Sequence, residues 1–496
     1  MESLARRYLD LWQDQWAAMA ADPDMTGAFA RLVRTLGQAA WPGAAPSPPP
    51  PPAARILGPA PGRARPSSPP PPSPGGPMPA HRAPPAGTAT TPPPKRRQGP
   101  RPLATHLTAA MAVLLNSQAG LPLLNGSSPI WRKELEPRCR QLRADLAGVD
   151  PEALNAAVER ETRRRLDALL TGLERYRRNP YQRDVTDPAP VWTEGDSRLL
   201  DYSQPGAKGP VLLFVPSLVN RGYVLDLSAR KSLVRWLSTR GFRPLLLDWG
   251  TVGTVERGFG LTDYVAGRLA RAVDATRDLM GPAPALVGYC MGGTLAAAAA
   301  VLRPESLSAL VLLAAPWDFH ADDPAAALRT AAVLPLLEPA LTWLGELPVD
   351  MIQFLFAGLD PLLALRKFSR YATLDPDSQD AQDFVALEDW LNDGVPLAAP
   401  VARECLGGWY GRNAPAEGTW RVAGQAIDAR AIRLPTLAII PARDRIVPPG
   451  AARALIDAIP GGDRLEPCLG HIGMVVSAGA PGQVWAPLAD WLRARL

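Results

Sequence analysis

The chain has 496 residues, 57 of them proline, and a formal net charge of +5. Its four cysteines are too widely spaced for a disulfide framework or a zinc-binding pattern, so we expect no bound metal. The amino terminus lacks the apolar core of a secretory signal, and the apolar stretch 285–302 fits a buried strand and helix better than a membrane span. We therefore expect a cytoplasmic protein with free thiols and no transmembrane helix.

Residues 1–41 have the pattern of one or two amphipathic helices. Apolar side chains recur at helical spacing, the first set being Leu4, Tyr8, Trp12, Trp16 and Met19. Two tryptophans on so short a helix predict either docking onto a partner helix or apolar surface, or packing back onto the chain's own domain.

Residues 42–102 form a basic segment rich in proline, alanine and serine. It cannot bury a core, and we expect an extended, disordered linker. Between Asp24 and Glu134 the chain has twelve lysines and arginines and no acidic residue. This charge could bind a polyanion or an acidic surface, or only keep the linker solvated. No aromatic residues are interleaved among the linker charges, and we do not expect nucleic acid as a partner.

Residues 103–188 are predicted to form a helical N-terminal segment, with a strongly charged helix at 154–173. From residue 189 to 496, short apolar runs alternate with helical stretches, the pattern of a mostly parallel α/β sheet. Strands are predicted at 211–215, 244–247, 285–289, 309–314 and 436–440.

The segment Gly288-Tyr289-Cys290-Met291-Gly292 joins the predicted strand 285–289 to a helix. This is the pattern of a nucleophile elbow, in which small flanking residues allow a sharp turn that exposes one side chain. Here that side chain is the thiol of Cys290, and a thiolate both attacks acyl groups and leaves them readily. The alternative is a small buried cysteine in an alanine-rich strand–helix unit.

The elbow predicts an α/β-hydrolase fold for residues 189–496. The strand–helix alternation stops between about 317 and 430, where apolar helical stretches occupy 331–344 and 351–368. An insertion at this point of the fold would form a helical cap over the active site.

A thiol nucleophile needs a base, and the base needs an acceptor that orients it. His471 lies in a loop between the last predicted strand and the final helix, where this fold supplies its base. Asp444 precedes it at the end of strand 436–440 and completes the order nucleophile, acid, base. Asp318 is an alternative acid, and His320 an alternative base.

The oxyanion hole is predicted from backbone N–H groups. One is that of Met291, directly after the nucleophile. A second would come from Ser217 or Leu218, in the loop that follows Pro216.

Several motifs in this order resemble the polyhydroxyalkanoate synthases, most closely the short, two-subunit type. The resemblance covers about residues 180–496. It is carried by Leu218-Val219-Asn220-Arg221-Gly222-Tyr223-Val224-Leu225-Asp226-Leu227, Ser232-Leu233-Val234-Arg235, Leu247-Asp248-Trp249-Gly250, Gly288-Tyr289-Cys290-Met291-Gly292-Gly293 and Gly470-His471-Ile472-Gly473.

The resemblance implies polymerisation of (R)-3-hydroxyacyl-CoA with release of coenzyme A. In family terms Cys290 would carry the growing chain as a thioester and His471 would activate the thiol. Asp444 would help to deprotonate the 3-hydroxyl of the incoming unit. No cofactor is implied beyond the coenzyme A thioester substrate. The implied partners are a polyester granule surface in the cytoplasm and a second copy or an accessory subunit.

Three features depart from the family pattern. The family usually has Asp-His where this chain has Asp444-Arg445, the cap segment 389–394 matches loosely, and the N-terminal helix with its linker is foreign to the short type. Two other functions therefore stay open: a cysteine-dependent hydrolase of the depolymerase or thioesterase kind, and a non-catalytic granule-associated protein. The intact cysteine, aspartate and histidine argue against the last.

Overall fold

The computed structural model describes residues 1–20, 97–125 and 131–496. Residues 21–41 of the predicted N-terminal helix region lie outside the described residues, as does the predicted linker up to residue 96. The prediction of a disordered linker is wrong for its last six residues, 97–102, because Arg97 binds Asp389 and the N–H of Arg101 donates to Asn392. No described helix is long and apolar enough to cross a membrane.

The centre of the fold is an eight-stranded sheet in the order β1-β2-β4-β3-β5-β6-β11-β12. Strands β4 to β12 run parallel along this order, whereas β1 and β2 pair antiparallel at one edge. The bounds are β1 Pro190–Glu194, β2 Ser197–Asp201, β3 Val211–Val215, β4 Arg243–Asp248, β5 Ala285–Tyr289, β6 Ala309–Leu313, β11 Thr436–Ile439 and β12 Asp463–Leu465.

All five predicted strands are confirmed as β3, β4, β5, β6 and β11, each to within one residue at either end. They are continuous apolar runs because both faces of the parallel sheet are covered. Strands β1, β2 and β12 were not predicted. They lie at or next to the edges of the sheet, and each is short and includes polar or charged residues, so none is a continuous apolar run.

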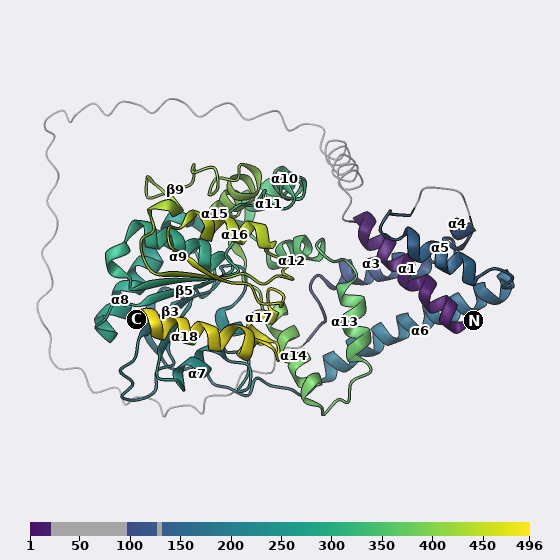
Figure 1. Ribbon diagram of the computed structural model, residues 1–496, viewed down its shortest axis with the longest axis horizontal. Helices are drawn as coiled ribbons and strands as arrows, with labels where there is room; N and C mark the ends of the chain where they lie inside the picture. Colours follow the sequence, from purple (N-terminus) through teal and green to yellow (C-terminus); the bar gives the residue numbers. More distant parts are fainter. Residues whose placement is uncertain (21–96, 126–130) are drawn as a thin grey trace, which may run out of the picture. The chain divides into compact units, whose positions relative to one another are not determined.

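Alternate side chains of each central strand enter two separate cores. In β3, Leu213 and Val215 face one core, and Leu212 and Phe214 face the other. Helices cover both faces of the sheet, as Figure 1 shows. The first core takes side chains from α8 Ala270–Met280, α9 Met291–Leu302 and α16 Pro449–Ala458; the second takes them from α7 Leu233–Ser238, α17 Gly473–Val476 and α18 Ala486–Arg495.

Short irregular helices complete the domain. They are the 3₁₀ turns η1 Gly222–Leu225, η2 Glu256–Gly258, η4 Pro304–Ser306 and η6 Ala429–Ala431, and the π-helical segments η3 Asp263–Leu269, η5 Glu404–Gly411 and η7 Pro481–Trp485. The α/β-hydrolase fold predicted from the elbow is confirmed.

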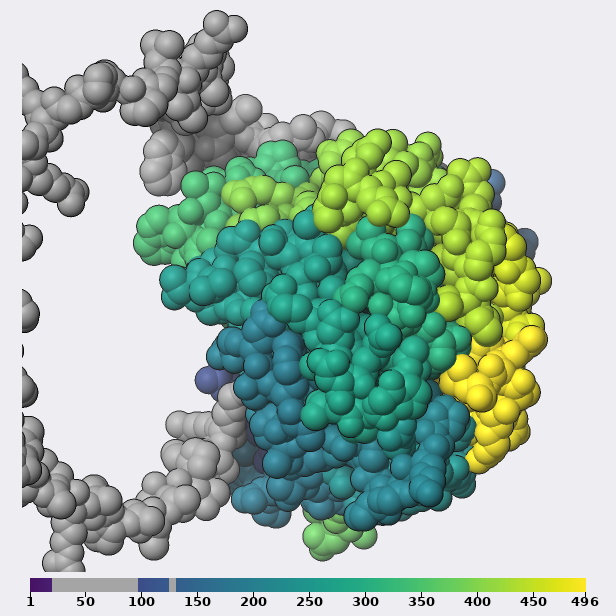
Figure 2. Space-filling view, turned by 90° about the vertical axis from the view of Figure 1, so that its left-hand side faces the viewer, coloured from purple at the N-terminus to yellow at the C-terminus, as the bar shows by residue number. Residues whose placement is uncertain are grey.

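The predicted cap is the insertion between β6 and β11, whose green residues lie next to teal residues of the α/β domain in Figure 2. The stretch 351–368 is interrupted, because α12 ends at Ala357 and α13 begins at Leu363. Pro361 between them has no N–H to continue the helix. The elements are α10 Pro324–Ala331, α11 Leu334–Leu344, β7 Glu346–Leu347, α12 Val349–Ala357, α13 Leu363–Tyr371, α14 Gln379–Asn392, β8 Leu397–Ala398, α15 Ala399–Arg403, β9 Arg421–Val422 and β10 Gln425–Ala426.

The N-terminal segment is helical, as predicted. Its charged helix is α6, which begins one turn before the predicted start because Asp150 caps it by accepting from the N–H groups of Glu152 and Ala153. The bounds are α1 Glu2–Ala20, α3 Leu103–Leu115, α4 Leu121–Asn125, α5 Glu136–Asp145 and α6 Pro151–Arg178.

The apolar stripe of α1 packs onto the chain itself. The hydroxyl of Tyr8 donates to the carbonyl of Ser117 at 2.5 Å, and the indole N–H of Trp12 donates to the carbonyl of Val113 at 2.9 Å. Tyr8 and Trp12 are buried in a core with side chains of α3, α5 and α6. Of the two alternatives for this helix, the structure therefore shows the intramolecular one.

Helix α6 also packs against the cap, and the contact depends on Gly172. A Cβ atom at this position would lie 2.0 Å from the carbonyl oxygen of Phe368 in α13. The backbones of the two helices therefore approach too closely for any side chain.

We expect Gly172→Ala to destabilise the fold by about 1–3 kcal/mol, because the added methyl must push α6 away from α13. The matched control is Gly482→Ala, where a Cβ meets no atom within 4 Å. Urea unfolding of the two variants measures the difference. Equal stability of Gly172→Ala and wild type would show that this helix contact is not tight.

Candidate active site

Cys290 occupies the turn between β5 and α9. Its backbone has φ 56° and ψ −130°, in a region that residues with a side chain rarely adopt. The N–H of Cys290 donates to the carbonyl of Leu313 in β6 at 2.8 Å, which fixes the turn against the neighbouring strand. The thiol is partly exposed and lies at the end of the sheet.

The two glycines of the elbow are required by close packing. A Cβ on Gly288 would lie 2.4 Å from the Cα of Gly293, and one on Gly292 would lie 2.1 Å from the carbonyl oxygen of Val215. Only glycine lets the start of α9 cross over the end of β3 at this distance. The pattern G-x-Cys-x-G is therefore a steric requirement of the turn.

His471 and Asp444 form a buried pair. The Nδ1 atom of His471 lies 2.6 Å from Oδ2 of Asp444, whose side chain is fully buried. The second carboxylate oxygen of Asp444 accepts from the N–H groups of Ile446 at 2.8 Å and Val447 at 2.9 Å. Both oxygens are therefore held, and Asp444 fixes the orientation and tautomer of the imidazole.

Burial lowers the pKa of His471, but the negative charge of Cys290 and the hydrogen bond to Asp444 outweigh it, so the pKa is raised above its ordinary value of 6.5. A hydrogen bond between Cys290 and His471 contributes in the same direction. The thiol and the imidazole therefore line the same cavity and lie close enough for Cys290 to raise the pKa of His471.

The ring of Tyr289 backs the imidazole. The two ring centres are 5.2 Å apart, and the phenol donates to the carbonyl of His471 at 3.3 Å. Burial and the neighbouring charges of Cys290 and Asp444 raise the pKa of this phenol, so it stays a neutral donor.

The residues predicted for the oxyanion hole lie around Cys290. Met291 is the first residue of α9, and its N–H donates to no protein acceptor within the described residues. Ser217 lines the same cavity as Cys290, and its hydroxyl accepts from the N–H of Val219 at 3.2 Å. Leu218 is buried in the sheet core. The loop after β3 and the start of α9 are thus in contact, as an oxyanion hole requires.

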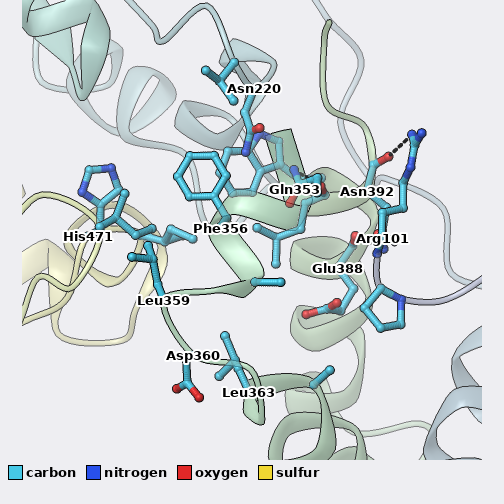
Figure 3. Close-up of a pocket in the computed structure, with 18 of the residues that line it drawn as sticks. Arg101, Asn220, Gln353, Phe356, Leu359, Asp360, Leu363, Glu388, Asn392 and His471 are labelled. Atoms are coloured by element: carbon cyan, nitrogen blue, oxygen red, sulfur yellow. Dashed lines mark hydrogen bonds between the residues drawn. The ribbon is translucent and has the colours of Figure 1, made fainter. Parts of the chain in front are cut away.

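A cavity of about 370 Å³ opens next to the thiol, a size typical of small-molecule sites. Cys290 and His471 line one end, and Arg101 with Asn392 lies across the cavity from His471 in Figure 3. Half of its lining residues come from the cap. The apolar lining residues are Val219, Phe356, Ala357, Leu359, Leu363, Ala364, Trp390, Leu391, Ile446 and Ile472.

The alternative acid and base have other partners. The carboxylate of Asp318 accepts from the Asn413 amide at 2.8 Å and from the N–H of His320 at 2.9 Å. The Nε2 atom of His320 lies 2.8 Å from the carbonyl oxygen of Tyr410. The structure does not bring either residue together with His471 and Cys290.

Among the described residues, no three His, Cys, Asp or Glu side chains gather as a metal site would require.

Several lining residues were not predicted. Pro100 and Arg101 come from the end of the predicted linker, His106 from α3, and Lys367 and Glu388 from the cap. The only sequence signal near them was the loosely matching segment 389–394, from which Trp390, Leu391 and Asn392 reach the cavity.

A family model described as "alpha/beta hydrolase fold" matches residues 210–478. Among solved structures, a thioesterase domain from the curacin biosynthetic pathway is similar, with 16% identity and a TM-score of 0.38 over 62% of this chain and 100% of that one.

Curated relatives are similar over the same part of the chain. The poly(3-hydroxyalkanoate) polymerase subunit PhaC of Haloferax mediterranei is 32% identical over 62% of this chain and 63% of its own length. Its namesake from Allochromatium vinosum is 30% identical over 63% of this chain and 89% of its own length. The chain belongs to the polyhydroxyalkanoate synthase family.

One departure from the pattern of the polyhydroxyalkanoate synthase family lies at the cavity rim. Arg445, next to Asp444, lines the cavity and is 81% exposed. Its guanidinium lies 3.6 Å from the carboxylate of Asp360 in the loop between α12 and α13. The arginine therefore faces the cap and solvent, and the His471–Asp444 pair of this synthase-family chain is formed without it.

We expect Cys290→Ala to lower the pKa of His471, because the substitution removes the negative charge that raises it. Asp444→Asn should lower it as well. NMR titration of the imidazole resonances measures both shifts, with His106, at the other end of the cavity, as an internal control. An unchanged His471 titration in Cys290→Ala would show that the thiol and the imidazole do not interact.

Proposed function

We propose that the chain polymerises (R)-3-hydroxyacyl units from their coenzyme A thioesters, with release of coenzyme A. The single observation that carries the proposal is the constellation of Cys290, His471 and Asp444 at one end of an apolar cavity, in a member of the polyhydroxyalkanoate synthase family. A thiol nucleophile suits this reaction because it can exchange one thioester for another with little change in energy.

In the first step the thiolate of Cys290 attacks the thioester carbonyl. The backbone N–H of Met291 and that of Ser217 or Leu218 would stabilise the negative oxygen of the tetrahedral intermediate. The thiolate of coenzyme A then leaves with the proton of His471. The products are an acyl thioester on Cys290, free coenzyme A and a neutral imidazole.

In the second step the neutral imidazole of His471 accepts the proton of a 3-hydroxyl group, and the hydroxyl oxygen attacks the acyl thioester. An ester forms and the thiolate of Cys290 leaves next to the imidazolium. The carboxylate of Asp444 does not line the cavity, and both its oxygens already accept hydrogen bonds. We therefore assign the proton transfer to His471 and give Asp444 the role of stabilising the imidazolium.

We also propose that the protein associates with the surface of its polyester product in the cytoplasm and works as a homodimer or with an accessory subunit. The exposed apolar side chains of the cap support such contacts. Trp343 is 86% exposed, and Phe354 and Leu359 are each 52% exposed.

We expect purified protein to release coenzyme A from (R)-3-hydroxybutyryl-CoA in proportion to insoluble polyester, and Cys290→Ala to reduce both by at least about a thousandfold, because no other group can take the acyl chain. Mass spectrometry of the trapped protein should show the acyl group on Cys290. The matched control is Cys468→Ala, which removes the exposed thiol and should leave turnover unchanged.

Two results would contradict the proposal. Release of coenzyme A with only free 3-hydroxybutyrate would indicate a thioesterase-like hydrolase on the same scaffold. Acylation of the Cys290→Ala variant would show that another thiol is the nucleophile.

A further inference from the structure

We propose that residues 97–106, which comprise the last six residues of the predicted linker and the first four of α3, form a wall of the substrate cavity and limit the length of the acyl group that Cys290 can accept. The choice of acyl-CoA as ligand rests on the proposed function, whereas the position of the wall rests on geometry alone. The segment would thus belong to the active site although it lies outside both the sheet and the cap.

The segment reaches the cavity from outside the α/β domain. Pro100, Arg101 and His106 line the same cavity as Cys290 and His471. In Figure 3, Arg101 lies on the side of the cavity opposite His471. An acyl group bound to Cys290 and extending along the cavity therefore points toward Arg101.

Arg97 anchors the start of this wall. Its guanidinium binds both carboxylate oxygens of Asp389 in α14, at 2.6 and 2.5 Å. It also donates to the carbonyls of Asn179 at 2.6 Å and Tyr181 at 2.7 Å. With four hydrogen bonds and a side chain only 15% exposed, Arg97 ties the segment to the cap and to the end of α6.

Arg101 is the second residue that anchors the wall. Its backbone N–H donates to Oδ1 of Asn392 at 3.1 Å, and its guanidinium donates to Asp350 in α12 at 2.7 Å. Both partners belong to the cap. Because the chain is held on each side of Pro100, by Arg97 and by Arg101, the wall has a defined position against the cap.

The wall is polar where it meets the far end of the cavity. The Nε2 atom of His106 lies 3.2 Å from the carbonyl oxygen of Arg101. Next to them, the ammonium of Lys367 lies 2.7 Å from the nearly buried carboxylate of Glu388, and both residues line the cavity.

This polarity would discriminate against long acyl groups. Binding of an alkyl chain is stabilised only when the chain leaves water for apolar surroundings. A chain that reaches these charged groups would also desolvate them, which costs free energy. The apolar part of the cavity next to Cys290 would hold a short side chain without either penalty. The geometry thus assigns a preference for short-chain 3-hydroxyacyl thioesters.

The test compares kcat/KM for (R)-3-hydroxybutyryl-CoA and (R)-3-hydroxyoctanoyl-CoA in wild type, Arg101→Ala and His106→Ala. We expect wild type to favour the shorter thioester, and each variant to raise the ratio of long to short by about fourfold for every methylene newly accommodated. The matched control is Arg138→Ala, whose side chain pairs with Asp14 on the surface of the same helical segment and should leave the ratio unchanged.

A ratio unchanged in both variants would overturn the inference. An equal change for both thioesters would indicate either a merely structural role or contact with the coenzyme A portion, and would overturn the limit on acyl length. A merely structural role lowers both rates together, so only a change of the ratio supports the proposal.

A second measurement does not depend on polymerase activity. The alkylation rates of Cys290 by N-methylmaleimide and N-octylmaleimide are compared by peptide mass spectrometry, with exposed Cys468 in the same sample as the reference for reagent reactivity. Arg101→Ala and His106→Ala should accelerate the octyl reagent relative to the methyl one at Cys290 only. If wild type turns over neither thioester, the proposed function fails, while this comparison still decides the position of the wall.

Discussion

The strained backbone of Cys290 is the constraint on which the active site depends. Its φ of 56° is a conformation that costs a non-glycine residue on the order of 1–3 kcal/mol. The surroundings impose it, because the N–H of Cys290 is bound to Leu313 of β6 and Gly292 is pressed against the carbonyl of Val215. The sharp turn places the thiol beyond the end of the central strand β5, where it lines the cavity. Under the proposed function, this strain is the physical cost of presenting a nucleophile on a rigid element.

The same turn also determines the electrostatic environment of the Cys290 sulfur. Cys290 immediately precedes α9, so its sulfur lies at the positive end of a helix that favours a negative charge. His471 is hydrogen-bonded to Asp444, and both carboxylate oxygens of Asp444 already accept hydrogen bonds. Under the proposed function, groups held in this way need little rearrangement when negative charge develops on the carbonyl oxygen.

The catalytic end of the site could be predicted from sequence because each part of it is encoded locally. The elbow is a five-residue motif with a steric cause, and His471 and Asp444 follow in the order that parallel strands impose. The central strands are apolar runs that both cores require. Other features had a weaker local signal. Strands β1 and β2 are short and mix apolar with polar residues, and the break between α12 and α13 is marked by a single proline within an otherwise helical pattern.

The far end of the cavity could not be predicted for a different reason. Arg97 and Asp389 are 292 residues apart in the chain, and neither residue alone resembles a motif. Contacts of Arg97 and Arg101 with the cap and with the end of α6 hold this segment against the cavity. Chemistry and selectivity are therefore encoded differently in this protein. The thiol, the imidazole and the carboxylate are fixed by the α/β domain, whereas the size and polarity of the pocket depend on contacts between distant segments. Substitutions in the N-terminal segment can then change which acyl group is accepted and leave the catalytic residues untouched.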